Sequence, residues 1–257
     1  MNDSSRLHKA SQFAVNLHAK RYAPTKIAAL LAVGRDAGLA EDALLEGSQL
    51  DVQSVMQAAT TISIAQYLHV ARNLVRLYPG PDVGIQVGKR LTISQYGIYG
   101  YAVLCAGTLR QACDITARYA PLGTPVFLPS LREESGLGVW TFPPINGIKL
   151  EDLDLDLCRF LIEAQFLIIA NGTKELMGST CRPSGARFAM PKPSDTTYLE
   201  QALDCPIQFD QAHNELDFDG SWLDRPPRLA SPIVAAQVCQ TLSKQLNELQ
   251  ASGGISH

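Results

Sequence analysis

The acidic residues between positions 152 and 163 come closest to a metal-binding pattern. Asp152, Asp154 and Asp156 alternate with leucines, and Glu163 takes the place of the twelfth ligand of an EF-hand loop. The sixth position of such a loop requires glycine for its sharp turn, and here it is Leu157. The helix dipole favours acidic side chains at a helix N-terminus. We therefore interpret the run as the start of a helix and expect no metal and no cofactor.

The sequence contains none of the short motifs that mark common catalytic sites. It has no GxSxG nucleophile elbow, no HExxH zinc motif and no GxxxxGKS/T phosphate loop. Its six cysteines are scattered without a CxxC pair and its five histidines are isolated, whereas zinc sites usually show closely spaced ligands. We predict that the chain is not an enzyme. The alternative is an unrecognised enzyme in which Arg159 and Glu163 polarise a substrate.

Aromatic and charged side chains within apolar stretches indicate a pocket. Three tyrosines crowd one short predicted helix, two aromatic residues share one face of a predicted strand, and three charged residues interrupt apolar runs. Small-molecule pockets are mostly apolar with a few convergent polar groups. The alternative is that the aromatic residues fill the core and the charged groups lie on solvated faces. The candidate ligand-binding residues are Tyr96, Tyr99, Tyr101, Arg118, Trp140, Phe142, Arg159 and Glu163.

The last predicted helix, which begins at Pro232, carries an apolar stripe. Such a stripe can pair with its copy in a second subunit, or it can pack on its own domain. The first possibility predicts a homodimer. The stripe starts at Ala235, and the candidate dimerisation residues within it are Val238, Leu242, Leu246 and Leu249.

Hydrophobic periodicity and end signals predict the helices that position these residues. The segment 64–78 has the clearest apolar period, and Pro79 and Gly80 end it. Ser94 and Thr108 are suitable N-caps for the two helices that follow it. Asn171 and Gly172 are expected to close the long apolar helix that starts at 153. The expected helices span 24–37, 41–45, 64–78, 94–105, 108–120, 153–170, 195–203 and 232–252.

Strand character appears only after position 125. The segments 126–132 and 138–142 flank a turn at 133–136 and predict a hairpin. Further short strands are expected at 187–190, 207–209 and 215–218. Helices first, then strands mixed with helices, predict an α+β fold, with a helical N-terminal part and a mainly antiparallel sheet flanked by helices. The absence of regular βαβ alternation argues against a Rossmann-type fold.

Charge and hydropathy exclude two classes of partner. The net charge is −3 over 257 residues, whereas a domain that grips nucleic acid usually has a basic face. No apolar run approaches the roughly 20 residues of a membrane helix, and residues 1–12 are too polar for a signal peptide. We expect a cytoplasmic protein without membrane contact. We expect a flexible segment at 1–23, one regulatory domain at 24–232, and a helix with a tail at 233–257.

Two stretches resemble a known family. Residues 96–112 contain Gly97, Gly100-Tyr101-Ala102, Thr108-Leu109 and Ala112 at the spacing GxxGYAxxxxxTLxxA. Residues 205–226 contain CPIQF, then HNELDF, then LDRP. Both resemble the N-terminal, arabinose-binding-like effector domain of AraC-type transcription regulators, and the similarity runs from about 24 to 232.

The resemblance implies a domain that binds a small-molecule effector. In the family, two helix-turn-helix units follow this domain, so DNA is expected to be bound only through a C-terminal part that this chain lacks. The segment after Pro232 would then be a dimerisation helix or a linker. The effector is unknown, because the domain's name does not establish arabinose as its ligand. The alternatives are a constitutive dimerisation module without a ligand and, in a different class, the unrecognised enzyme.

Overall fold

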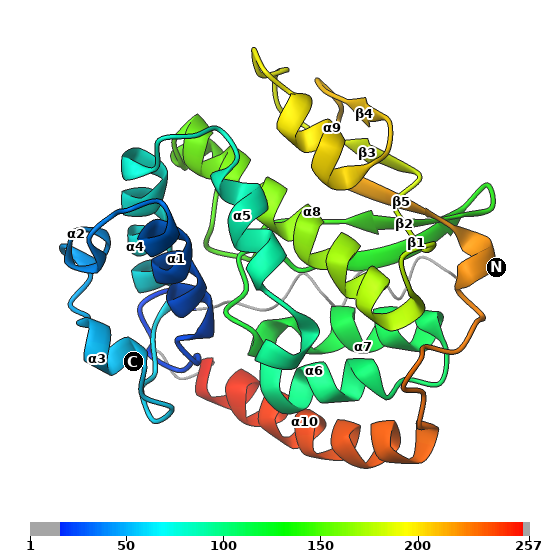
Figure 1. Cartoon of the computed structure of the whole chain (residues 1–257). Helices are drawn as coiled ribbons and strands as arrows, with labels where there is room; N and C mark the ends of the chain where they lie inside the picture. The colour runs from blue at the N-terminus through cyan, green and yellow to red at the C-terminus, as the bar shows by residue number, and fades with distance from the viewer. Residues whose placement is uncertain (1–15, 254–257) are drawn as a thin grey trace.

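The first part of the chain is a cluster of helices. The computed structural model describes residues 16–253. In α4, Ser63 and Gln66 form a reciprocal capping box, which fixes the helix start predicted from the apolar period. Figure 1 shows these helices to one side of the sheet. They are α1 (Thr25–Asp36), α2 (Glu41–Leu45), α3 (Val52–Val55), α4 (Ile64–Leu77) and α5 (Val83–Arg90).

The remaining helices surround the middle of the molecule. Figure 1 shows α8 running between α5 and the sheet, and α10 lying along α6 and α7. Thr108 caps α7 as predicted, and Asp154 caps α8 by accepting from the backbone N–H of Leu157 at 2.8 Å. These helices are α6 (Gly97–Leu104), α7 (Leu109–Tyr119), α8 (Leu155–Met177), α9 (Thr197–Leu203) and α10 (Pro232–Gly253).

Five strands form one sheet in the order β1-β2-β5-β3-β4. The pairs β1–β2, β2–β5 and β5–β3 are antiparallel, and β3–β4 is parallel with α9 as its crossover. Ser135 and Gly136, both at positive φ, turn the β1–β2 hairpin. The predicted α+β fold with a mainly antiparallel sheet is confirmed. The strands are β1 (Ser130–Glu134), β2 (Leu137–Thr141), β3 (Gly185–Arg187), β4 (Ile207–Gln208) and β5 (Glu215–Asp219).

The structure differs from the prediction at one helix boundary and in one additional helix, both where α5 and α8 lie. The helix α8 continues through Asn171 and Gly172 to Met177. The helix α5 was not predicted, because its two glycines lower helix propensity. Both glycines face α8, where a Cβ at Gly88 would stand 2.8 Å from the carbonyl oxygen of Ala164. Their lack of a side chain therefore allows α5 and α8 to pack closely.

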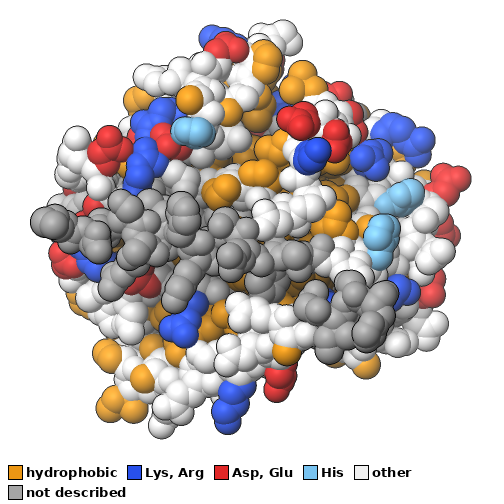
Figure 2. Space-filling model, turned by 180° about the vertical axis from the view of Figure 1, so that it is seen from behind, with side chains coloured by type: hydrophobic (Ala, Val, Ile, Leu, Met, Phe, Trp, Pro, Cys, Tyr) orange, Lys and Arg blue, Asp and Glu red, His pale blue; other side chains and the backbone are white. Residues whose placement is uncertain are grey.

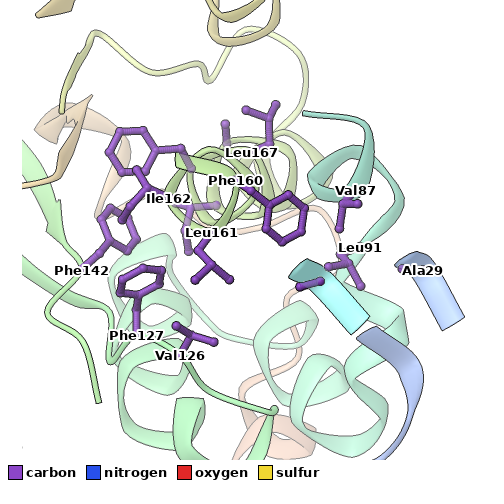
Figure 3. Close-up of a cluster of buried hydrophobic side chains, with 14 of the residues drawn as sticks. Ala29, Val87, Leu91, Val126, Phe127, Phe142, Phe160, Leu161, Ile162 and Leu167 are labelled. Atoms are coloured by element: carbon purple, nitrogen blue, oxygen red, sulfur yellow. The ribbon is translucent and has the colours of Figure 1, made fainter. Parts of the chain in front are cut away.

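A row of aromatic rings joins the sheet to α8. The ring centroids of Phe142 and Phe166 are 5.1 Å apart, those of Phe166 and Phe188 are 4.7 Å apart, and Phe209 stacks on Phe188. Figure 3 shows Phe142 on one side of α8 and Phe160 on the side of Val87 and Leu91. The core thus extends on both sides of α8, which holds this helix in a fixed rotation.

The described face in Figure 2 is mixed in charge, and part of the N-terminal segment is buried. In Figure 2, basic and acidic side chains are mixed over the described part of one face, without a continuous basic band. Of the helices that the structure describes, none is long and apolar enough to cross a membrane. Residues 1–15 of the segment expected to be flexible lie outside the described range, and Tyr22 within it is buried and pairs with Ile62.

Candidate ligand-binding site

A cavity lies between α6, α7, α8 and the strand β2. It encloses about 810 Å³ of space between its lining atoms, with the open solvent at its mouth included. The helix α6 contributes Tyr99, Gly100 and Val103, and β2 contributes Trp140. The wall therefore combines segments that are far apart in the sequence.

One stripe of α8 forms the longest wall of this cavity. Its lining residues recur at helical spacing over three turns, so their side chains share one helix face. Most of the stripe is apolar, and the Gln165 amide has no hydrogen-bond partner among the described residues. The stripe consists of Gln165, Ile168, Ile169, Gly172, Thr173 and Leu176.

Polar groups gather at the segment 123–125, which also lines the cavity. The Lys26 ammonium reaches this segment from α1 and donates to the carbonyl oxygen of Thr124 at 2.9 Å. Gly123 lies against the rings of Tyr96 and Tyr99. The Tyr99 hydroxyl donates to the carbonyl oxygen of Thr116 at 3.0 Å and so connects α6 to α7. The cavity therefore has one polar end.

Burial changes the acid–base properties of these polar groups. Desolvation lowers the pKa of Lys26 to about 8. Desolvation also raises the pKa values of the Tyr96 and Tyr99 phenols well above their usual range, so both remain neutral hydroxyls. Among the lining residues that the structure describes, Lys26 is the single charged side chain and none is acidic. The cavity therefore presents one uncompensated positive charge in an apolar wall.

Residues 38–227, most of the chain, match the family described as the arabinose-binding domain of AraC transcription regulator, N-terminal. The chain belongs to this family. Membership confirms the resemblance seen in the motifs at residues 96–112 and 205–226. It also confirms that the chain is not an enzyme, because the family consists of transcription regulators.

Individual regulators resemble this AraC-type domain over much of its length. The ornithine utilization regulator of Pseudomonas aeruginosa is 22% identical over 228 residues, which cover 88% of this chain and 65% of that protein. An uncharacterized HTH-type transcriptional regulator of Mycobacterium tuberculosis is 29% identical over 171 residues, covering 61% of this chain and 45% of that protein. The chain thus spans less than two thirds of the length of these relatives.

A solved structure shares the fold. The crystal structure of the transcriptional regulator CdpR from Pseudomonas aeruginosa superposes with a TM-score of 0.68 at 15% sequence identity. The match covers 89% of this chain and 65% of CdpR. The fold of this chain therefore also occurs in that transcriptional regulator.

Three of the eight candidate ligand-binding residues line the cavity of this AraC-type domain. They are Tyr96, Tyr99 and Trp140. Tyr101, two residues beyond Tyr99 and hence on the opposite side of α6, is 49% exposed. Phe142 belongs to the aromatic row of the core.

The three charged candidates lie away from the lining. Arg118 stacks its guanidinium on the Tyr119 ring, 5.3 Å from the centroid. Glu163 is 1% exposed and accepts a 2.8 Å hydrogen bond from the Tyr198 hydroxyl, and Arg159 approaches it at 4.0 Å. Burial raises the pKa of Glu163 to about 7. Glu163 stands two residues before Gln165, so it points to the other side of α8, against α5.

Sequence reasoning missed Lys26 and Gln165. The signal for Lys26 was its place on α1, where Leu30 and Val33 follow at i+4 and i+7 on the buried face. A lysine in that register predicts either a long stem that reaches solvent or a buried ammonium. Gln165 stood in the apolar run of α8, six residues after Arg159, and only the rotation of the packed helix shows that it faces the cavity.

The apolar stripe of α10 packs on the chain itself. Leu242 is fully buried, and Val238 and Leu246 are partly buried against the same core. Leu249, the fourth candidate, is half-buried. The Tyr119 hydroxyl donates to the carbonyl oxygen of Cys239 at 3.1 Å and lies 2.8 Å from the Ser243 hydroxyl. This face of α10 is thus occupied within one chain.

Within residues 16–253, no group of three or more His, Cys, Asp or Glu side chains could hold a metal ion. Asp154, from the acidic run, caps α8 and pairs with Arg72 at 3.3 Å. Asp156 pairs with Arg159 at 3.0 Å. The acidic run therefore has the helix-start role inferred from the sequence.

Proposed function

We propose that this chain is the effector-sensing domain of an AraC-type regulator and that the cavity between α6, α7 and α8 holds the effector. The proposal rests mainly on one observation: a mostly apolar cavity is lined by the tyrosine-rich helix that carries the family motif. The effector would control DNA binding by helix-turn-helix units that belong to the longer regulators of the family. A cytoplasmic location and a homodimer are part of this proposal.

The path from the cavity to α10 runs through α6 and α7. Tyr99 and Val103 of α6 line the cavity, and α6 also packs along α10 (Figure 1). The backbone N–H of Ser231, just before α10, donates to the carbonyl oxygen of Cys105 at the end of α6, at 2.9 Å. Tyr119 adds a second connection, from α7 to the middle of α10. A displacement of α6 would therefore be transmitted to both α10 and its entry.

Binding shifts such an arrangement only when the effector prefers one of two conformations. A ligand that presses on Tyr99 or Val103 from inside the cavity would favour the conformation in which α6 is displaced. The effector would then influence DNA binding by changing the position of α10.

A thermal-denaturation screen tests this function. The purified chain is heated with a library of bacterial metabolites, because a ligand that binds only the folded state raises the melting temperature by mass action. The variant Gly172→Leu fills the cavity from α8, where a Cβ would be 3.4 Å from the Ile93 side chain. Lys174→Leu, on the same helix but outside the lining, is its matched control.

We expect an effector to raise the melting temperature of the wild-type chain and of Lys174→Leu, and to leave Gly172→Leu unchanged. An equal rise in all three proteins would exclude the cavity as the effector site. No rise with any compound would favour a constitutive module without a ligand.

A further inference from the structure

The ammonium group of Lys26 indicates what the cavity binds. Lys26 is only 9% exposed, and its ammonium donates a 2.9 Å hydrogen bond to the carbonyl oxygen of Thr124. Its Nζ also lies 5.6 Å from the centroid of the Tyr67 ring. Lys26 takes part in no ion pair with a described carboxylate. Buried lysines are rare unless they are paired, because an uncompensated charge loses its hydration.

The ammonium of Lys26 has N–H donors that the described residues do not use, so it can bind an anionic partner. An ammonium has three N–H donors, and the protein accepts from one of them. Tyr96 also lines the cavity, and its hydroxyl has no hydrogen-bond partner among the residues described. A carboxylate at this end of the cavity would accept from Lys26 and from Tyr96, giving charge-assisted hydrogen bonds.

The rest of the lining fits a hydrocarbon or aromatic body. Away from the polar end, the wall includes Val103, Leu109, Phe127, Trp140 and Ile169. The hydroxyls of Thr116 and Thr173 donate back to carbonyl oxygens of their own helices, at 2.8 Å in both cases. Their donors are therefore not available to a ligand, and the apolar wall favours burial of an apolar group.

We propose that the effector is an amphipathic monocarboxylate, with its carboxylate paired to Lys26 and its apolar body between α6, α7 and α8. This inference rests on the proposed function, since it identifies the ligand class of the same cavity.

Three other ligand classes fit the lining less well. A free sugar needs a partner for each of several hydroxyls, and the cavity offers few unused polar groups. An amino acid carries an ammonium group, for which the described lining has no acidic partner. A phosphate ester carries up to two negative charges, against the single positive charge of Lys26. The single negative charge of a monocarboxylate neutralises the single positive charge of Lys26.

The test compares carboxylates with alcohols of the same shape. The probes are octanoate with 1-octanol, and 4-phenylbutanoate with 4-phenyl-1-butanol. Binding is followed by the fluorescence of Trp140 in a Trp222→Phe background, because Trp140 lines the cavity and Trp222 does not. Lys26→Met removes the charge but keeps an apolar side chain of similar length. Lys89→Met, at an exposed lysine of α5, is the matched control.

We expect the carboxylates to bind about 10- to 100-fold more tightly than the alcohols, the range of one or two charge-assisted hydrogen bonds. Lys26→Met should abolish this preference, and Lys89→Met should retain it.

Two results would overturn the inference and leave the proposed function intact. One is equal binding of carboxylate and alcohol with a Trp140 response, because the cavity would then be used without charge selection. The other is that none of the four probes changes the Trp140 fluorescence, while the thermal screen finds a different effector whose stabilising effect is lost in Gly172→Leu. No effector in either experiment would contradict both proposals.

Discussion

Lys26→Met should stabilise the ligand-free chain, because it removes a buried charge that no anion balances. The pKa of Lys26 falls from 10.5 to about 8 on folding. At about 1.36 kcal/mol for each pH unit, this fall corresponds to roughly 3 kcal/mol. The carbonyl oxygen of Thr124 loses its donor in the variant, which costs about 1 kcal/mol. We therefore expect the variant to be about 1–3 kcal/mol more stable at pH 7.

The stability difference between Lys26→Met and the wild type should depend on pH. Below pH 8 the amine is protonated in both the folded and the unfolded chain, so the full cost of the buried charge is present. Between pH 8 and 10.5 the unfolded chain holds a proton that the folded chain has lost, so the wild type gains stability as pH rises. The advantage of Lys26→Met should accordingly shrink from pH 8 upward and be gone before pH 10.5.

Urea unfolding of wild type and variant at several pH values measures this difference. Other groups also titrate in that range. The thiols of Cys181 and Cys205 have pKa values raised to about 11 by burial, so they lower stability as pH rises. They act equally in both proteins and cancel in the difference. At pH 7 a stability gain of about 1 kcal/mol corresponds to about 2–4 °C in melting temperature for a chain of this size.

Lys89→Met provides the control, since it removes an exposed lysine of α5 that does not line the cavity. The reasoning would be refuted if Lys26→Met were less stable than the wild type at pH 7, or if the difference were the same at pH 7 and pH 10. In either case the ammonium would be satisfied within the protein, and the cavity would not need an anion.

Two further predictions concern groups outside the cavity. Glu163→Gln should be up to about 3 kcal/mol more stable than the wild type at pH 8 and equal to it near pH 4.5. The reason is that the pKa of Glu163 is raised to about 7, so the wild type loses stability as pH rises from 4.5 to 7. Urea unfolding at pH 4.5 and pH 8 would measure both values, and a variant that is less stable at pH 8 would contradict the assignment. Leu242→Ala should cost about 2–5 kcal/mol of the chain's own stability; equilibrium sedimentation checks the other possibility, since a dimer that dissociates in this variant without a loss of melting temperature would show that the stripe of α10 serves a second subunit.

Part of the fold and of the site could be predicted from the sequence. The apolar period of α4 and its Ser63 cap are local signals, and so are the hairpin turn at Ser135 and Gly136. The tyrosine-rich helix, the strand with Trp140 and the long helix, which all carry candidate residues, line one cavity. The helix period, the cap and the turn depend on neighbours within a few residues, which a linear pattern contains.

The rest depends on helix rotation and on contacts between distant segments. On α8 a step of two residues turns a side chain by about 200°, so Glu163 lies against α5 whereas Gln165 faces the cavity. On α6 the same step separates Tyr101, which is exposed, from Tyr99. Lys26 reaches its partner Thr124 across 98 residues of sequence. Periodicity establishes that a helix has two faces, but only packing determines what each face meets.

The segment before α6 explains why the cavity and α10 should respond together. Ile93 lines the cavity, and a Cβ at Gly100 would collide with its carbonyl oxygen, so α6 lies directly on this segment. The backbone N–H of Ile93 also donates to the Glu175 carboxylate at 3.2 Å, which connects the segment to α8. A ligand that separates α6 from α8 must therefore disturb Ile93 as well as the contact between α6 and α10. Because packed interfaces respond by switching between arrangements rather than by stretching, this junction is where an effector of an AraC-type domain would exert its differential affinity.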